Sequence, residues 1–148
     1  MSDSKEPAPE RTASTPSTKT RGDAAEAAAA RLLLESGLEV VARNVIAGGV
    51  ELDIIARDRR AAPALYVFVE VRSRSDARLG HPLETIDASK RKRLIRGASA
   101  WLVQASLWEK VAVRFDVIAL THDFSDPNAG PLSADAVVWL EGAFDGDA

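Results

Sequence analysis

The sequence predicts a single α/β domain in which helices pack on a mixed β-sheet, with elements in the order α-β-β-β-α-β. A chain of 148 residues suits one domain with a substantial core. Two stretches rich in helix formers alternate with apolar runs of strand length, and Gly, Pro, Asn and Asp mark the joins. No internal repeat is visible. These observations together indicate one layered domain, and nothing suggests a second.

The N-terminal region divides into a polar tail and a helix. Residues 1–20 are rich in Ser, Thr, Pro and charged side chains and almost free of large apolar ones. Such a segment cannot bury enough surface to offset the entropy of ordering, so we predict a disordered tail. Asp23 has the side chain of an N-cap, and strong helix formers follow it as far as Gly37, a residue type that commonly ends helices. The sequence therefore predicts a helix between these two residues.

Three strands are expected next. An apolar run at 38–46 predicts the first, and Gly48-Gly49 makes a turn. Residues 50–56 predict the second strand, and the turn formers at 58–63 lead into a third at 64–72. Alternate residues of the third strand divide into an apolar face with Leu65, Val67, Val69 and Val71, and a second face with Tyr66, Phe68, Glu70 and Arg72.

The remaining elements are predicted from the same signals, apolar periodicity and turn-forming residues. We predict an irregular segment (73–86), a helix (87–105), a strand (110–121), a loop (122–134) and a short strand (137–140). Asp116 in the predicted strand could be a further functional acid, although Arg114 beside it suggests a surface pair. The predicted organisation is a tail at 1–20, a domain at 21–121, and a C-terminal segment at 122–148 with a loop, a short strand and an acidic tail.

Composition excludes several classes of protein. No apolar run is near the length needed to cross a bilayer, and the first twenty residues lack the apolar stretch of a signal peptide, so we expect a cytoplasmic protein. The absence of cysteine excludes disulfides and thiolate metal sites. His81 and His122 are too few for a histidine metal site, and no nucleophile elbow or phosphate loop is present.

Charge is distributed unevenly along the chain. The formal net charge is −3, but the middle, residues 21–121, is mildly basic, whereas residues 122–148 hold acids and no Lys or Arg. Four basic residues of the second predicted helix, Lys90, Lys92, Arg93 and Arg96, could hold a phosphodiester backbone without sequence preference, and Arg74 and Arg78 could extend this track. A solvated helix face is the alternative reading of the same basic run.

Charged residues two positions apart interrupt two of the apolar runs: Glu51 and Asp53 in one, Glu70 and Arg72 in the other. Alternate residues of a strand point to one face, so each pair would project from the same side of the sheet. Because about six residues rich in turn formers separate the runs, we expect a hairpin that gathers the four side chains into one cluster. From spacing alone, a cross-strand salt-bridge network on a solvated face explains the cluster equally well.

The cluster also has the chemistry of a metal and phosphate site. Mg²⁺ or Mn²⁺ takes oxygen ligands and usually one or two protein carboxylates, which Asp53 and Glu70 could supply. Arg72, on the same face, could contact a phosphate or stabilise its charge in the transition state. Glu26 shares a helix face with the apolar stripe, where an acid is unusual, and could form the rear of the site; an acid favoured by the helix dipole is an equal alternative.

The ordered motifs RGDAAEAAAARLLLESG, ARN, GGVELDIIA, YVFVEVRSR, GHPLETI, KRKRLIRGASAWL and VRFDVIAL resemble the YraN family of small bacterial proteins. That family resembles the Holliday-junction-resolvase-like branch of the restriction-endonuclease fold. The resemblance, over roughly residues 21–121, implies a PD-(D/E)xK-type nuclease core. In it Asp53 takes the place of the first acid, Glu70 that of the second, Arg72 that of the lysine, and Glu26 that of the helical acid. A homodimer is possible, because resolvases of this fold often cut two strands.

Arg72 is the main departure from the nuclease pattern. An arginine stays protonated, so it cannot act as a general base, although it can still bind phosphate or hold Glu70. The leading hypothesis is a Mg²⁺- or Mn²⁺-dependent endonuclease-like protein acting on DNA, with branched or damaged DNA in repair or recombination as the candidate substrate. Asp53 and Glu70 would hold the metal, with Glu26 or Glu51 assisting. Two alternatives stay open: a non-catalytic nucleic-acid-binding module on a nuclease fold, and an interaction domain whose acidic C-terminal tail docks a basic partner.

Overall fold

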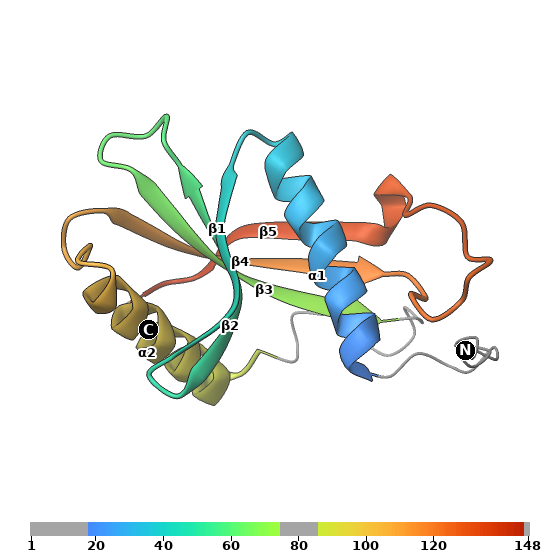
Figure 1. Cartoon of the computed structure of the whole chain (residues 1–148), viewed down its shortest axis with the longest axis horizontal. Coiled ribbons are helices and arrows are strands. Elements are labelled where there is room, and N and C mark those ends of the chain that lie inside the picture. The colour runs from blue at the N-terminus through green and yellow to red at the C-terminus, as the bar shows by residue number, and fades with distance from the viewer. Residues whose placement is uncertain (1–17, 75–85, 147–148) are drawn as a thin grey trace, which may run out of the picture.

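The computed structural model describes residues 18–74 and 86–146, with side-chain positions for residues 22–73 and 86–146. Within this part of the chain, the strands form one mixed sheet in chain order (Figure 1). The strands are β1 (Glu39–Ala47), β2 (Val50–Asp58), β3 (Leu65–Arg74), β4 (Ala112–Thr121) and β5 (Val137–Phe144). Only the pair β3–β4 is parallel among these neighbours; the other pairs are antiparallel. A parallel pair needs a crossover connection, and this one contains a helix.

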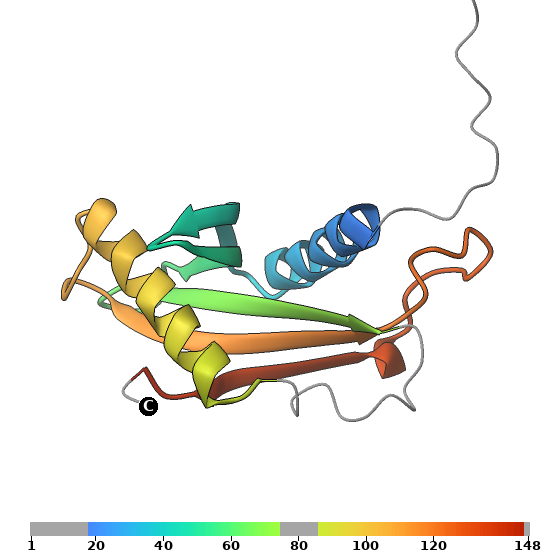
Figure 2. The ribbon, with the colours of Figure 1, turned by 90° about the horizontal axis from the view of Figure 1, so that it is seen from below.

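Two helices cover opposite faces of the sheet. Helix α1 (Thr18–Glu35) packs on one face, and α2 (Ala88–Gln104), the crossover between β3 and β4, packs on the other (Figure 2). The predicted α/β class and the order α-β-β-β-α-β are therefore confirmed, with β5 as an additional strand. No described helix is long and apolar enough to cross a membrane.

The sheet separates two apolar cores, and the alternation predicted for β3 is confirmed. Val67 and Val69 belong to the core beneath α1, with Ala29, Leu33, Ile54 and Ile118. Tyr66 and Phe68 belong to the core beneath α2, with Leu52, Leu94, Leu102 and Phe115. Because strands buried on both faces stabilise the fold through both layers, β3 and β4 form the rigid centre of the molecule.

The structure confirms the predicted C-terminal end of α1 and corrects its predicted N-terminal end. The predicted stop at Gly37 is confirmed: its φ of 94° lies in the region that favours glycine, and the Leu38 N–H donates to the Leu33 carbonyl at 3.0 Å. The predicted N-cap at Asp23 is wrong, because α1 begins at Thr18 and Asp23 lies inside it. Gly22 within a helix costs only about 1 kcal/mol, too little to stop the first turns from forming. Residues 1–17 of the predicted tail lie outside the described residues.

The helix–sheet contact on the α2 side is unusually close. Gly97 is buried in α2, and a Cβ added there would lie 2.9 Å from the Val50 Cβ atom and 3.2 Å from a Leu52 methyl group. A glycine is therefore required for α2 to lie this near β2. Asp87 caps the start of the helix, since its side chain accepts a hydrogen bond from the Lys90 N–H at 2.9 Å.

The C-terminal region corrects two predictions. Strand β5 runs to Phe144 instead of ending near residue 140, so part of the predicted acidic tail is a sheet edge. Asp116 is fully buried and not part of a surface pair. Its carboxylate accepts hydrogen bonds from the Arg114 guanidinium (2.8 and 2.9 Å), the Trp139 indole (3.0 Å) and the Gly142 N–H (3.0 Å). This network joins β4 to β5 where the register shifts between Phe115 and Val117.

Candidate active site

The sheet forks at the predicted cluster. The ladder between β2 and β3 runs from Asp58↔Leu65 to Ile54↔Val69 and ends there. Beyond this point each strand keeps its other neighbour. Strand β2 still pairs with β1, for example at Val45↔Leu52, and β3 still pairs with β4, for example at Arg72↔Ala119. The first residues past the last pair are Asp53 and Glu70. The fork therefore places one carboxylate on each of two diverging strands.

A side chain replaces the missing backbone pairing at the fork. The Asp53 carboxylate accepts a hydrogen bond from the Val71 N–H at 2.9 Å. This bond satisfies a backbone donor that has left the ladder, and it fixes the orientation of the Asp53 side chain. The acid of β2 is thereby held against β3 even though the two backbones have separated.

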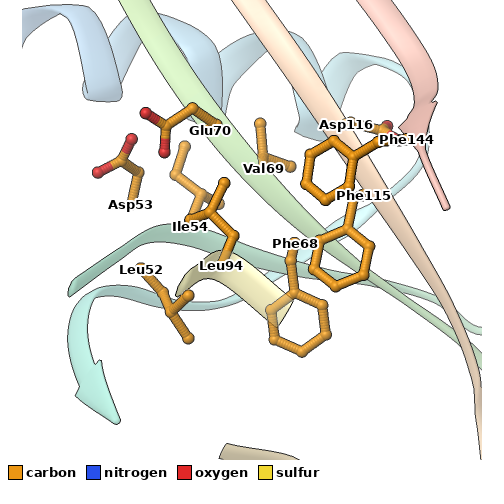
Figure 3. A pocket seen from close by; sticks show the side chains of 10 residues that line it. All are labelled: Leu52, Asp53, Ile54, Phe68, Val69, Glu70, Leu94, Phe115, Asp116 and Phe144. Carbon is orange, nitrogen blue, oxygen red and sulfur yellow. The ribbon is translucent and has the colours of Figure 1, made fainter. Parts of the chain in front are cut away.

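The two carboxylates lie at the edge of an apolar hollow. In Figure 3 the carboxyl groups of Asp53 and Glu70 lie next to each other at one end, Asp116 lies at the other, and apolar side chains fill the space between them. The apolar lining consists of Leu52, Ile54, Phe68, Val69, Leu94, Phe115 and Phe144. Such surroundings withhold water from Asp53 and penalise its charged form.

Burial and mutual repulsion act together on Asp53. Burial is the larger cause, and with the neighbouring charge of Glu70 it raises the pKa of Asp53 to about 7. The Val71 hydrogen bond and the charge of Lys90 act in the opposite direction but do not cancel these effects. An aspartate in this state would be stabilised by an added cation, because a cation offsets both the repulsion and the loss of hydration.

Two basic side chains contact the same oxygen of Glu70. Arg72 Nη2 lies 3.4 Å from Glu70 Oε2, and Lys90 Nζ lies 3.5 Å from it. The Glu70 side chain is 8% exposed, so these contacts form in a largely water-excluded place. Arg72 comes from β3, as the sequence predicts, whereas Lys90 comes from the first turn of α2. The predicted cluster therefore also contains a cation from the helix that packs on the sheet.

Glu26 borders the site from α1. A hollow lined by Gly22, Ala25, Glu26, Asp53, Glu70, Val71 and Ser73 joins the N-terminal part of α1 to the fork. Burial raises the pKa of Glu26, a hydrogen bond from the Asn44 side chain lowers it, and the charge of Glu51 raises it. Glu26 Oε1 is buried without a hydrogen-bond partner in the described part of the chain. This acceptor could be satisfied by a cation or its hydration shell.

The predicted four-residue cluster is not formed as such. Glu51 is exposed and lines a second hollow with Gly22, Asp23, Glu26 and Asn44, away from Glu70 and Arg72. The cause is the fork: β2 bends away from β3 before it reaches Glu51, so strand alternation no longer carries that residue to the acids of β3. The expectation that alternate residues share one flat face is wrong at this point.

Comparison with known proteins places the chain in a family. Residues 25–120 match the sequence profile of the uncharacterised protein family UPF0102. The chain belongs to this family, the YraN family. The resemblance found in the sequence motifs is thereby confirmed.

Relatives in UPF0102 share most of the chain. A UPF0102 protein of Pectobacterium carotovorum is 40% identical over 114 residues, 75% of this chain and 93% of the relative. One of Pseudomonas paraeruginosa is 39% identical over 127 residues, covering 86% and 94%. Another, of Oleidesulfovibrio alaskensis, is 37% identical over 115 residues, 78% of this chain; the match spans about half of that relative, 54% of its length. The shared name assigns no activity.

The donor set of this UPF0102 member suits a hard divalent cation. In the described part of the chain no three His, Cys, Asp or Glu side chains are close enough to form a ready-made metal group. Asp53 and Glu70 form a pair, however, and Mg²⁺ is usually held by one or two carboxylates with water and phosphate at the other positions. The repulsion in this pair and the unsatisfied Glu26 Oε1 atom are both relieved by a cation. Mg²⁺ or Mn²⁺ therefore fits these residues.

The residues predicted to contact nucleic acid fall into separate groups. Lys92, Arg93 and Arg96 are exposed on α2. Lys90 is half-buried and turned toward Glu70. The side chain of Arg74 and the whole of Arg78 lie outside the described residues. The sequence analysis thus predicted that Lys90 contacts the phosphodiester backbone of nucleic acid, and it missed the contact of Lys90 with Glu70. A lysine in the first turn of a helix, opposed by the helix dipole, was the signal available for it.

Proposed function

We propose that this UPF0102 protein is a Mg²⁺- or Mn²⁺-dependent endonuclease-like enzyme that hydrolyses phosphodiester bonds in DNA. The observation that carries the proposal is the fork, where Asp53 and Glu70 lie side by side on diverging strands with two cations on Glu70. Structural ion pairs bring opposite charges together, whereas this arrangement also holds two like charges in an apolar setting. Like charges held together and desolvated are typical of a functional site.

Each residue has a distinct role in this proposal. Asp53 and Glu70 would hold the metal, which when bound neutralises phosphate charge and lowers the pKa of a bound water. Glu26 would accept hydrogen bonds from the hydration shell through its unsatisfied oxygen. Arg72 would hold Glu70 in place and face the phosphate. Glu51, which is exposed beside Glu26, would contribute charge at a distance and not ligate.

The proposed reaction is a hydrolysis that conserves atoms and charge. A water oxygen forms a bond to phosphorus while the bond from phosphorus to the leaving oxygen breaks. One proton of the attacking water passes to solvent, and the leaving oxygen takes up a proton from solvent. The residues of the site stabilise the added negative charge on the phosphoryl oxygens without forming a covalent bond to it.

The exposed basic face of α2 supports DNA as the substrate. Lys92, Arg93 and Arg96 lie on the helix whose first turn contributes Lys90 to the site, so a backbone held by this face would lead to the acids. Contacts of this kind are independent of sequence and weaken with salt. Branched or damaged DNA is the substrate class that the resemblance to resolvases adds to the proposal.

Cleavage assays with Mn²⁺ on branched, flapped and single-stranded DNA test this function. Wild type should cut at least one substrate, and Asp53→Asn and Glu70→Gln should each reduce the rate at least a hundredfold, because both remove a negative ligand while keeping its shape. Asp135→Ala, which removes an exposed acid in the turn before β5, is the matched control and should leave the rate unchanged. Equal inactivity of wild type and variants on every substrate would refute catalysis.

The same samples separate catalysis from binding alone. In Lys92→Glu, Arg96→Glu protein, DNA affinity should fall and the salt dependence of binding should decrease by about two counterions. A wild type that binds DNA in this way but cuts nothing would be the non-catalytic binding module. Unchanged DNA affinity in the double variant would show that this face of α2 does not contact DNA.

A further inference from the structure

Arg72 leaves one part of the proposed site without an explanation. The resemblance to PD-(D/E)xK nucleases puts Arg72 where a lysine is expected, and its guanidinium approaches a single oxygen of Glu70. A guanidinium is a broad, permanently charged fork, whereas an ammonium is a compact point charge with three donors that can turn toward a water or a phosphate oxygen. If hydrolysis at this site needs such a point charge, another residue has to supply it.

Lys90 satisfies the geometric requirement. Its ammonium lies 3.5 Å from Glu70 Oε2, the oxygen that Arg72 also contacts. The backbone that carries it is fixed at two places, because the Lys90 N–H donates to the Asp87 carboxylate and the Arg91 guanidinium donates to the Ile86 carbonyl. The close approach of α2 to β2 at Gly97 sets the distance from this helix to the fork.

The surroundings of Lys90 differ from those of an ordinary surface lysine. Of the other lysines whose side chains the structure describes, Lys92 and Lys110 are exposed. Lys90 is half-buried and stands in the first turn of α2, where the helix dipole disfavours a positive charge. Helix stability therefore does not account for a lysine at this position, whereas the acids at the fork do.

We propose that Lys90 is the catalytic lysine of this site, supplied by α2 instead of β3. Its ammonium donates to the attacking water beside Glu70 and to a phosphoryl oxygen, while Arg72 acts as a positioning residue that holds Glu70. This inference rests on the proposed hydrolysis of DNA. It adds that the two cations have separate roles, Lys90 from α2 in catalysis and Arg72 from β3 in positioning. It uses the ammonium as a donor and a charge, and the proton of the attacking water still passes to solvent.

Substitution of Lys90 by methionine and by arginine tests the proposal, with Lys110→Met, which removes an exposed lysine outside the site, as the control. Three quantities are measured for each protein: Mn²⁺ affinity by calorimetry without DNA, DNA affinity in EDTA, and cleavage at saturating Mn²⁺ and DNA. Mn²⁺ should bind Lys90→Met several-fold more tightly than wild type, because a positive charge beside Glu70 has been removed. Lys110→Met should match wild type within twofold in Mn²⁺ affinity.

The cleavage results separate a catalytic role from a structural one. Lys90→Met should lose at least a hundredfold in kcat with DNA affinity within about threefold of wild type. Lys90→Arg should restore the wild-type Mn²⁺ affinity but not the rate. Full recovery of the rate in Lys90→Arg would show that any cation suffices and would overturn the assignment. A fall in DNA affinity as large as the fall in rate would also overturn it, in favour of a simple backbone contact.

Failure of this inference can be told apart from failure of the proposed function. If wild type cuts DNA, Asp53→Asn does not, and Lys90→Met cuts at the wild-type rate, the lysine assignment is wrong and the nuclease proposal stands. If wild type cuts no substrate, both proposals fail together. An Mn²⁺ affinity unchanged in Lys90→Met would show that the ammonium does not act on the carboxylates in solution, and would likewise refute the assignment.

Discussion

Two aspartates, one fully buried and one half-buried, have very different surroundings in this fold. Asp116, on β4, is fully buried, and its oxygens accept hydrogen bonds from Arg114, Trp139 and Gly142. Asp53, at the end of the β2–β3 ladder, accepts the Val71 N–H and faces the carboxylate of Glu70. The first acid is neutralised by the protein itself. The second is held in an arrangement that an added cation would relieve, which distinguishes a functional acid from a structural one.

Removal of the structural acid should have the largest effect. Asp116→Ala leaves the Arg114 guanidinium and the N–H groups of Trp139 and Gly142 without their acceptor, so the free energy of unfolding should fall by about 3–5 kcal/mol. Urea unfolding followed by circular dichroism measures this, with the exposed Asp135→Ala as control. A loss below 1 kcal/mol would mean that the network does not stabilise the β4–β5 pair.

Removal of the proposed metal-binding acid, Asp53, should change the free energy of unfolding in the opposite direction. Asp53→Asn keeps an oxygen for the Val71 N–H but removes a buried charge next to Glu70, so at pH 8 it should stabilise the metal-free protein by about 1–3 kcal/mol. The same change should abolish stoichiometric Mn²⁺ binding. Thermal unfolding and calorimetry on one preparation measure both effects. Destabilisation by Asp53→Asn would make Asp53 a structural acid like Asp116.

The pH dependence sharpens the same contrast. The pKa of Asp53 is about 7 in the folded protein, above the unfolded value of about 3.9, so between these values the folded chain keeps a proton that the unfolded chain has lost. The contribution of Asp53 to stability is therefore present at low pH and is lost as the pH rises toward 7. The stability difference between wild type and Asp53→Asn should follow this trend when unfolding is measured from pH 4 to 8.

Metal affinity should change with pH in the opposite direction. Since the metal binds the ionised carboxylate, Mn²⁺ affinity should rise by up to about tenfold per pH unit below pH 7 and level off above it. Calorimetry at pH 5.5, 6.5 and 7.5 measures this. A flat profile over this range would show that Asp53 is already ionised at pH 5.5.

The smallest expected effect is at the helix–sheet contact. Gly97→Ala adds a methyl group 2.9 Å from the Val50 Cβ atom, which is too close for two carbon atoms, so α2 or β2 has to shift at this contact. The strain is partly offset by the better helix propensity of alanine, and the net loss in stability should be about 1 kcal/mol or less. Because α2 carries Lys90, this variant should lose more cleavage activity than stability. Cleavage activity equal to that of wild type would show that catalysis does not depend on the exact position of α2.

The sequence predicted the fold better than the site. Strand and helix positions followed from periodicity and turn residues, and Gly37 ended α1 as expected. Asp53 and Glu70 were predicted as neighbouring acids because each is a charged residue within an apolar strand. Glu51 was misplaced, because strand alternation assumes a continuous ladder and gives no sign of a fork after Ile54. The contact between Lys90 and Glu70 depends on the path of a crossover helix, and the burial of Asp116 depends on the length of β5; neither is encoded in local spacing.

The crossover also determines the order in which the site can assemble. Asp53 and Glu70 belong to consecutive strands of one hairpin, a local contact that folding chains make quickly. Lys90 reaches them only when α2 has packed and β4 has paired with β3, which joins residues as distant in sequence as Leu65 and Ala112. The hairpin that carries the two carboxylates can therefore form before Lys90 reaches them, at a stage when Arg72 is the counter-charge that β3 itself supplies to Glu70. If a divalent cation binds Asp53 and Glu70 as proposed, it would offset their repulsion at that stage, and metal supply would then affect how fast the chain folds as well as what the folded protein does.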